Sequence, residues 1–123
     1  MQHILVVDDS ATMRRMVLAS LRGLPGLRFS EAGNGLEAIE RMVLDPFDLM
    51  VLDLNMPDMH GLEVIRFVRS HAAYAALPIL VLTTRGDADS RAAVEQAGGS
   101  AYLTKPFEPA ALAGEVRGLL GSG

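Results

Sequence analysis

The stretch VLDLNMPDMHG, residues 51–61, joins the end of an apolar run to a carboxylate and then to a loop that contains Pro57 and Gly61. Residues 49–52 are continuously apolar, as expected of a central strand that helices cover on both faces. A charge at the end of such a strand is costly when it is buried without a partner. Asp53 is therefore the first candidate for a functional residue, and other parts of the chain must supply what offsets its charge.

Strand-like runs and helix-like spacings alternate along the whole chain, which indicates an α/β protein. The apolar runs predict five strands, at residues 4–7, 27–31, 49–52, 79–82 and 101–103. Short connections between alternating elements predict a doubly wound, parallel sheet with helices on both faces. The first, third and fourth strands are rich in Val, Ile and Leu, so we expect them in the interior of the sheet.

Apolar residues between the strands recur at helical spacing and predict five helices. They are Met13, Met16, Val17 and Leu21 in the first; Leu36 and Ile39 in the second; Leu62, Ile65 and Val68 in the third; Val94 in the fourth; and Leu112, Val116, Leu119 and Leu120 in the fifth. Ser10 is a candidate N-cap, Gly23 follows the end of the first helix, and the turn at Asn34 precedes the second. The fourth helix, residues 87–97, has Val94 as its only large apolar residue, so we expect it to be held weakly.

Composition limits the classes of function. The chain has 123 residues, of which 50% are hydrophobic, enough for one domain with a real core. A net charge of −4 argues against binding to nucleic acid, and no apolar run approaches the roughly 20 residues that a membrane helix needs. The absence of cysteine excludes disulfides and fits a cytoplasmic protein. His3, His60 and His71 lack the spacing of metal ligands, so we expect structural or surface roles for them.

Polar residues follow four of the predicted strands. In parallel sheets, chemistry gathers at the carboxyl ends of the strands. That edge would hold Asp8 and Asp9, Asp53, Thr83 and Thr84, and Lys105. Two carboxylates about 4 Å apart repel by roughly 4 kcal/mol at an effective dielectric near 20, so three of them need a raised pKa, a facing lysine or a divalent cation. An all-oxygen site favours Mg²⁺, or Mn²⁺, and Mg²⁺ commonly takes a phosphate oxygen as a further ligand.

Four motifs in this order resemble the receiver domain of two-component response regulators. They are VVDDS at 6–10, VLDLNMPDMHG at 51–61, VLTT at 81–84 and YLTKPF at 102–107. The resemblance covers the whole chain and is strongest to single-domain receivers of the CheY-like type that act in chemotaxis. It implies the flavodoxin-like strand order 2-1-3-4-5 with five helices. It also implies one receiver domain over residues 1–123, without an output domain.

The resemblance implies a role for each residue at this edge. Asp53 would accept a phosphoryl group from a CheA-like sensor histidine kinase, with Lys105 and Thr83 contacting phosphoryl oxygens. Mg²⁺ would be held by Asp8, Asp9, Asp53 and the backbone carbonyl of Asn55. Water would later hydrolyse the acyl phosphate, so the protein would phosphorylate and dephosphorylate itself without being a conventional multiple-turnover enzyme.

Switching is also implied by the resemblance. Thr83 would move toward Asp53, and Tyr102 would turn inward and change the surface formed by the fourth helix, fifth strand and fifth helix. Arg85 and Asn55 would flank the phosphoryl group, and the Lys105-Pro106 peptide would be cis. The implied downstream partners are a flagellar motor switch protein and a phosphatase, and we expect a cytoplasmic monomer.

Other interpretations fit single motifs. A flavin-binding module of this strand order would need a Ser, Thr or Gly loop after the first strand, where Asp8 and Asp9 would repel the cofactor phosphate. A haloacid-dehalogenase-like phosphatase has a DxDx(T/V) motif on the first strand, whereas the aspartates here are adjacent. Taken alone, Asp8 or Asp9 could cap a helix, Asp53 could form an Asx turn, and Tyr102 could be an edge-strand aromatic. A phosphorelay receiver, or a receiver taken from a longer regulator, stays open.

Overall fold

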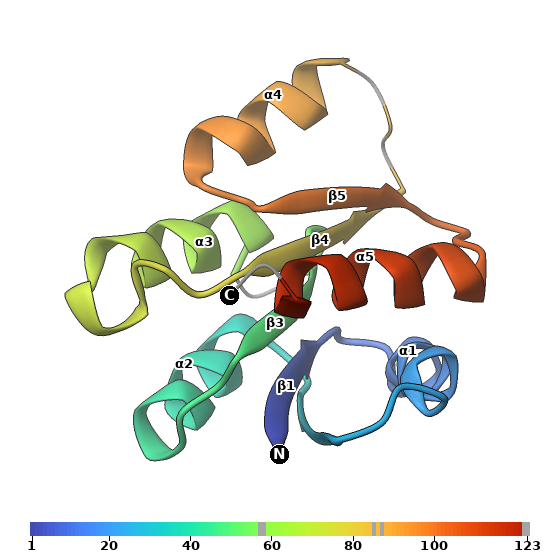
Figure 1. Cartoon of the computed structure of the whole chain (residues 1–123). Coiled ribbons are helices and arrows are strands. Elements are labelled where there is room, and N and C mark those ends of the chain that lie inside the picture. Colours follow the sequence, from blue (N-terminus) through green and yellow to red (C-terminus); the bar gives the residue numbers. More distant parts are fainter. Residues whose placement is uncertain (57–58, 85, 87, 122–123) are drawn as a thin grey trace.

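The computed structural model describes residues 1–56, 59–84, 86 and 88–121. It has one five-stranded parallel sheet in the order β2-β1-β3-β4-β5, as predicted (Figure 1). The strands are β1 (Gln2–Val7), β2 (Leu27–Ala32), β3 (Leu49–Asp53), β4 (Ile79–Thr83) and β5 (Ala101–Thr104). The three strands predicted to be interior, β1, β3 and β4, lie between the other two. The last four strands each continue one residue beyond the predicted carboxyl end, because Ala32, Asp53, Thr83 and Thr104 still pair with a neighbouring strand.

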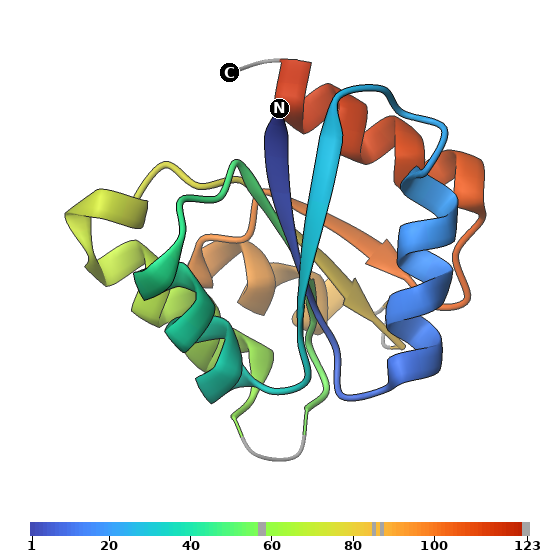
Figure 2. The same cartoon turned by 90° about the horizontal axis from the view of Figure 1, so that it is seen from below.

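Helices cover both faces of the sheet. They are α1 (Ala11–Leu21), α2 (Gly35–Leu44), α3 (Gly61–Ser70), α4 (Ala88–Ala97) and α5 (Pro109–Gly121), with a short 3₁₀ helix η1 (Ala72–Tyr74) that the sequence did not predict. Figures 1 and 2 show α1 and α5 on one side of the sheet and α2, α3 and α4 on the other. No helix within the described residues is long and apolar enough to cross a bilayer.

The core has two parts because side chains of the strands alternate between the two faces. Leu5, Leu52 and Val81 belong to the cluster beneath α2, α3 and α4. Val51 and Leu80 belong to the cluster beneath α1 and α5. The interior strands therefore serve both clusters, which explains their continuously apolar sequences.

Side-chain caps fix where helices begin. Ser10 Oγ accepts from the Met13 amide at 3.2 Å, as predicted, and Asn34 Oδ1 accepts from the Glu37 amide at 2.8 Å. His60 Nδ1 accepts from the Leu62 amide at 3.2 Å and starts α3, a role that its sequence context did not reveal. The caps at Ser10 and His60 start the helices that follow β1 and β3 in the chain.

Burial differs among the apolar residues of the helices. Met16 is 49% exposed and Leu36 is 58% exposed, although both lie in helices that their spacing predicted. Val94 is the one buried residue of α4, which confirms the prediction of a sparsely packed helix. The predicted start of that helix at Asp87 lies outside the described residues.

Candidate functional site

Three carboxylates meet where β1 and β3 end. One oxygen from each of Asp8, Asp9 and Asp53 lies within 4.8 Å of the others. The parallel register pairs Val7 with Leu52, which brings the residue after each into adjacent positions. Asp8 is 2% exposed and Asp53 is 3% exposed, whereas Asp9 is exposed.

The two buried carboxylates are fixed by similar local turns. Asp8 Oδ1 accepts from the Ser10 amide at 2.9 Å, and Asp53 Oδ1 accepts from the Asn55 amide at 3.1 Å. Each is an Asx turn, in which a side chain binds the backbone two residues later. The turn proposed as a purely structural role for Asp53 is therefore present, and it also orients the carboxylate.

Lys105 reaches both buried carboxylates from the end of β5. Its Nζ donates to Asp53 Oδ1 at 3.0 Å and to Asp8 Oδ2 at 3.2 Å. Its backbone amide donates to the Thr83 carbonyl at 2.7 Å, which extends the β4–β5 pairing to Lys105. The Lys105-Pro106 peptide is cis, as predicted. Ion pairs from Lys105 to Asp8 and Asp53 thus link the end of β5 to the ends of β1 and β3.

Burial and charge act together on the pKa values at this site. Burial raises the pKa of Asp53, and neighbouring Asp8 raises it further, although the hydrogen bond from Lys105 opposes both. Burial alone would lower the pKa of Lys105, but its hydrogen bond and Coulomb attraction to Asp53, together with Asp8, raise that pKa above its ordinary value. The Lys105 ammonium therefore stays charged. Its positive charge does not fully offset the effects of burial and of Asp8 on the pKa of Asp53.

Asn55 links the acidic end of β3 to the end of β4. Its Nδ2 donates to Thr83 Oγ1 at 3.4 Å and to Thr84 Oγ1 at 3.3 Å. Thr83 is fully buried, so its hydroxyl lies at the inner side of the site. Tyr102 lies apart from this group, half-buried on β5 against the α2–α3–α4 side of the core. Arg85, predicted to flank the phosphoryl group, lies outside the described residues.

Arg14 contributes to the site and was not predicted. Its Nη1 donates to the Asp8 carbonyl at 2.6 Å, while its Nε donates to Glu31 Oε1 at 2.9 Å. A basic residue one turn into the helix that follows the acidic pair is the signal that could have revealed it. Arg14 holds the backbone of the acidic loop, in a position where its guanidinium does not pair with the carboxylates of the cluster.

The donor set fits a small divalent cation. Three carboxylates face one ammonium group, which leaves excess negative charge. Each of the clustered donors is a carboxylate oxygen, the ligand type that Mg²⁺ and Mn²⁺ prefer. Histidine and thiolate ligands, which favour zinc, do not contribute to the acidic cluster found in the described part of the chain.

Comparisons with known proteins identify the family. The sequence profile of the response regulator receiver domain matches residues 4–117. A chemotaxis protein CheY homolog from Campylobacter jejuni is 36% identical over 121 residues, which are 98% of this chain and 93% of that protein. The chain therefore belongs to the family of response regulator receiver domains, as its motifs predicted.

Solved structures narrow the class to CheY-like receivers. The chemotaxis response regulator CheY4 of Vibrio cholerae has a TM-score of 0.90 at 34% identity, covering 98% of this chain and 99% of CheY4. The Mn²⁺-bound form of response regulator Rcp1 has a TM-score of 0.81 at 28% identity, covering 97% of this chain and 91% of that chain. The chain is thus a receiver domain of a CheY-like response regulator, and the flavin-binding and phosphatase interpretations are excluded.

Proposed function

We propose that the protein accepts a phosphoryl group on Asp53 from the phosphohistidine of a CheA-like sensor histidine kinase and so switches a partner-binding surface. The observation that carries this proposal is Lys105 Nζ lying 3.0 Å from Asp53 and 3.2 Å from Asp8, at the edge where three carboxylates converge. A lysine in this position can contact a phosphoryl oxygen as a compact positive charge.

In the proposed transfer, an Asp53 carboxylate oxygen attacks phosphorus while the phosphorus–nitrogen bond of phosphohistidine breaks. The imidazole leaves, and an acyl phosphate forms on Asp53. The Asx turn to Asn55 holds the attacking carboxylate in one orientation, which lowers the entropy lost on reaching the reactive geometry. Hydrolysis later breaks the bond between phosphorus and the carboxylate oxygen, as water supplies the oxygen of inorganic phosphate.

Asp8, Asp9, Asp53 and the Asn55 carbonyl would hold Mg²⁺. When bound, the cation would neutralise negative charge on the transferring group. The carboxylate cluster supports this assignment, and the Rcp1 structure holds Mn²⁺, a cation with similar preferences. Arg14 would keep the Asp8 backbone in place from behind the site.

Thr83 would couple phosphorylation to the partner surface. Its hydroxyl accepts a hydrogen bond from the side-chain amide of Asn55. A move toward a phosphoryl oxygen would exchange that contact for a charge-assisted hydrogen bond. Tyr102 would then rotate inward, changing the surface of α4, β5 and α5. The single buried residue of α4 supports a helix that can shift at low cost.

The proposed setting is chemotaxis in the cytoplasm, with a flagellar motor switch protein as the downstream target and a phosphatase acting on the acyl phosphate. The names of the Campylobacter and Vibrio relatives include chemotaxis, which supports that part of the proposal. A phosphorelay receiver would use the same acidic site with a different partner. One receiver domain over residues 1–123 that acts as a monomer also stays a prediction.

The test is labelling with acetyl phosphate, a small phosphodonor, followed by intact mass measurement. We expect the wild type to gain one phosphoryl group only with Mg²⁺, and this group to survive acid and be lost in alkali. Asp53→Asn should gain none. Asp45→Asn is the matched control, because Asp45 is exposed at the end of α2 and outside the cluster. Equal labelling of Asp53→Asn and wild type would overturn the assignment.

A further inference from the structure

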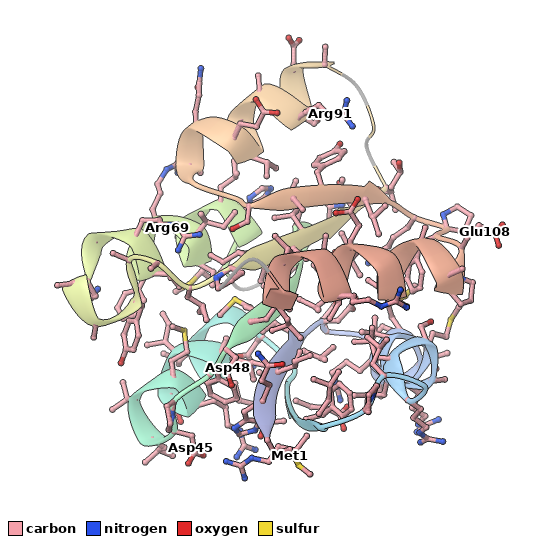
Figure 3. The ribbon with its side chains drawn as sticks, viewed as in Figure 1. Met1, Asp45, Asp48, Arg69, Arg91 and Glu108 are labelled. Carbon is pink, nitrogen blue, oxygen red and sulfur yellow. The ribbon has the colours of Figure 1, made fainter. Side chains whose placement is uncertain are left out.

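Arg91 on α4 and Tyr102 on β5 form a contact that the proposed phosphorylation chemistry does not require. The Arg91 guanidinium carbon lies 5.3 Å from the centroid of the Tyr102 ring. A guanidinium within about 6 Å of a ring centroid is attracted to the electron-rich face of the ring. Figure 3 labels Arg91 on α4, above β5.

Two glutamates lie near Arg91 and Tyr102 in a surface hollow. A surface hollow of about 260 Å³ is lined by Arg91, Tyr102, Glu95 and Glu115, among others. Glu95 lies four residues after Arg91 on α4, a spacing at which opposite charges on a helix pair. Glu115 reaches the hollow from α5. Arg91 therefore contacts the aromatic ring and shares one hollow with two carboxylates.

The packing of α4 makes this contact important for the helix. Val94 is the one buried side chain of α4. Tyr102 is half-buried and packs against the core cluster that contains Val94. A cation held against the ring adds an interaction that joins the helix to the ring.

We propose that Arg91 is a positioning residue that holds Tyr102 in its unphosphorylated orientation. When the ring turns, Arg91 releases it and pairs with Glu95 or Glu115 instead. This proposal rests on the proposed function, since it concerns how readily the same switch responds. Because coupling between two sites is reciprocal, a contact that favours the unphosphorylated orientation must weaken binding of a phosphoryl mimic by the same factor.

The orientation of Tyr102 can be measured directly by NMR. Scalar couplings from Tyr102 Cγ to its backbone nitrogen and carbonyl carbon report the χ1 populations of the ring. The chain has two tyrosines, so Tyr74 serves as an internal reference for an unaffected ring. The variants are Arg91→Met, which removes the charge and keeps the length, and Arg91→Lys, which keeps a cation. Arg66→Met, an exposed arginine of α3, is the matched control.

Without phosphorylation, Arg91→Met should shift the χ1 population of Tyr102 toward the orientation that the phosphoryl mimic induces in the wild type. Arg91→Lys should stay nearer the wild type, and Arg66→Met should match it. Titration with beryllium fluoride and Mg²⁺ should show apparent affinity about two- to five-fold higher in Arg91→Met, the change expected from an exposed cation–π contact. A general loss of helix α4 would instead lower helicity and fail to be rescued by lysine.

The outcomes separate this proposal from the proposed function. If beryllium fluoride binds the wild type and all variants alike, and the Tyr102 couplings do not change, the role of Arg91 is wrong while the phosphoacceptor site stands. If the wild type neither binds the mimic nor accepts phosphate, the proposed function is wrong. The couplings of the unliganded variants then decide the Arg91 contact by themselves, because equal χ1 populations in wild type and Arg91→Met would overturn it.

Discussion

Two partly buried cations lie at opposite edges of the sheet. Lys105, at the carboxyl edge, donates to the carboxylates of Asp8 and Asp53. Arg69, on α3 at the amino edge, donates to the carbonyls of Gly98, Tyr74 and Ala75, at 2.9, 3.3 and 3.2 Å, and to Ser100 Oγ at 3.4 Å. Figure 3 labels Arg69 on α3, on the side of the molecule where α4 leads into β5.

The partners of the two cations explain their different pKa shifts. Carboxylates raise the pKa of Lys105 although burial acts against them. Burial lowers the pKa of Arg69. Arg69 ties three chain segments together with neutral acceptors, which is a structural use of a cation. Lys105 is held among carboxylates that repel one another, an arrangement that costs stability and that the proposed phosphoryl transfer would use.

Among substitutions that test this difference between the two cations, Arg69→Met should change the free energy of unfolding most. The substitution removes the Arg69 donor from the carbonyls of Gly98, Tyr74 and Ala75, of which Tyr74 still accepts from the Leu77 amide. We expect the free energy of unfolding to fall by roughly 3 kcal/mol, because Arg69 makes several hydrogen bonds and each bond from a charged donor contributes about 1.5–3 kcal/mol. Urea denaturation measures the change, with Arg66→Met as the exposed control on the same helix. A loss no greater than the control's would show that Arg69 does not stabilise the amino edge.

Gly98→Ala should destabilise the same amino edge of the sheet, here by changing the backbone next to Arg69. Gly98 has a φ of +109°, and an added Cβ would lie 2.8 Å from Arg69 Cγ. We expect a loss of about 1–3 kcal/mol from backbone strain and displacement of Arg69. Gly118→Ala on α5 is the opposite control, because its Cβ would meet nothing within 4 Å and alanine should stabilise the helix by about 0.5–1 kcal/mol. If Gly98→Ala and Gly118→Ala changed the free energy of unfolding in the same direction, the structural role of Gly98 would be wrong.

His3, at the start of β1, should make stability at the amino edge depend on pH. It is 5% exposed, its Nε2 shares a hydrogen bond with Ser30 Oγ at 2.7 Å, and burial, followed by the charge of Arg28, lowers its pKa. The unfolded chain then binds a proton more readily, so stability is full above about pH 6.5 and falls as the pH decreases below it. The slope for one proton is at most about 1.4 kcal/mol per pH unit.

The measurement for His3 is urea denaturation between pH 5.5 and 7.5, where most carboxylates remain ionised. His3→Gln should lose most of the slope below pH 6.5. An unchanged slope in this variant would assign the pH dependence to another group.

The strand and site positions could be predicted from sequence because they depend on local patterns. A continuous apolar run followed by Asp53 predicts both a central strand and its functional end. Parallel topology then brings Asp8, Asp53 and Lys105 to one edge without knowledge of any side-chain contact. The structure agrees with this grouping.

Other features depend on contacts between distant segments. Nothing in the sequence around Arg69 shows that residues 74, 75, 98 and 100 will lie around its guanidinium. The exposure of Met16 and Leu36 follows from how α1 and α2 rotate against the sheet, which the spacing of apolar residues defines only coarsely. The contact of Arg91 with Tyr102 likewise appears only when α4 lies against β5.

The central claim is that the charge of Asp53 is retained for chemistry at a cost in stability. Because its pKa is raised in the folded protein, ionisation near neutral pH destabilises the fold. Asp53→Asn should therefore be more stable than wild type in EDTA, by about 1 kcal/mol, since Lys105 offsets most of the roughly 4 kcal/mol of repulsion expected between close carboxylates.

Urea denaturation of wild type and Asp53→Asn, each in EDTA and in excess Mg²⁺, tests this claim most directly. Asp45→Asn controls for loss of one acidic charge elsewhere. We predict that Asp53→Asn exceeds wild type in EDTA, and that Mg²⁺ stabilises the wild type more than the variant, because a cation that binds the folded state raises its stability. A less stable Asp53→Asn, together with equal responses to Mg²⁺, would contradict the account.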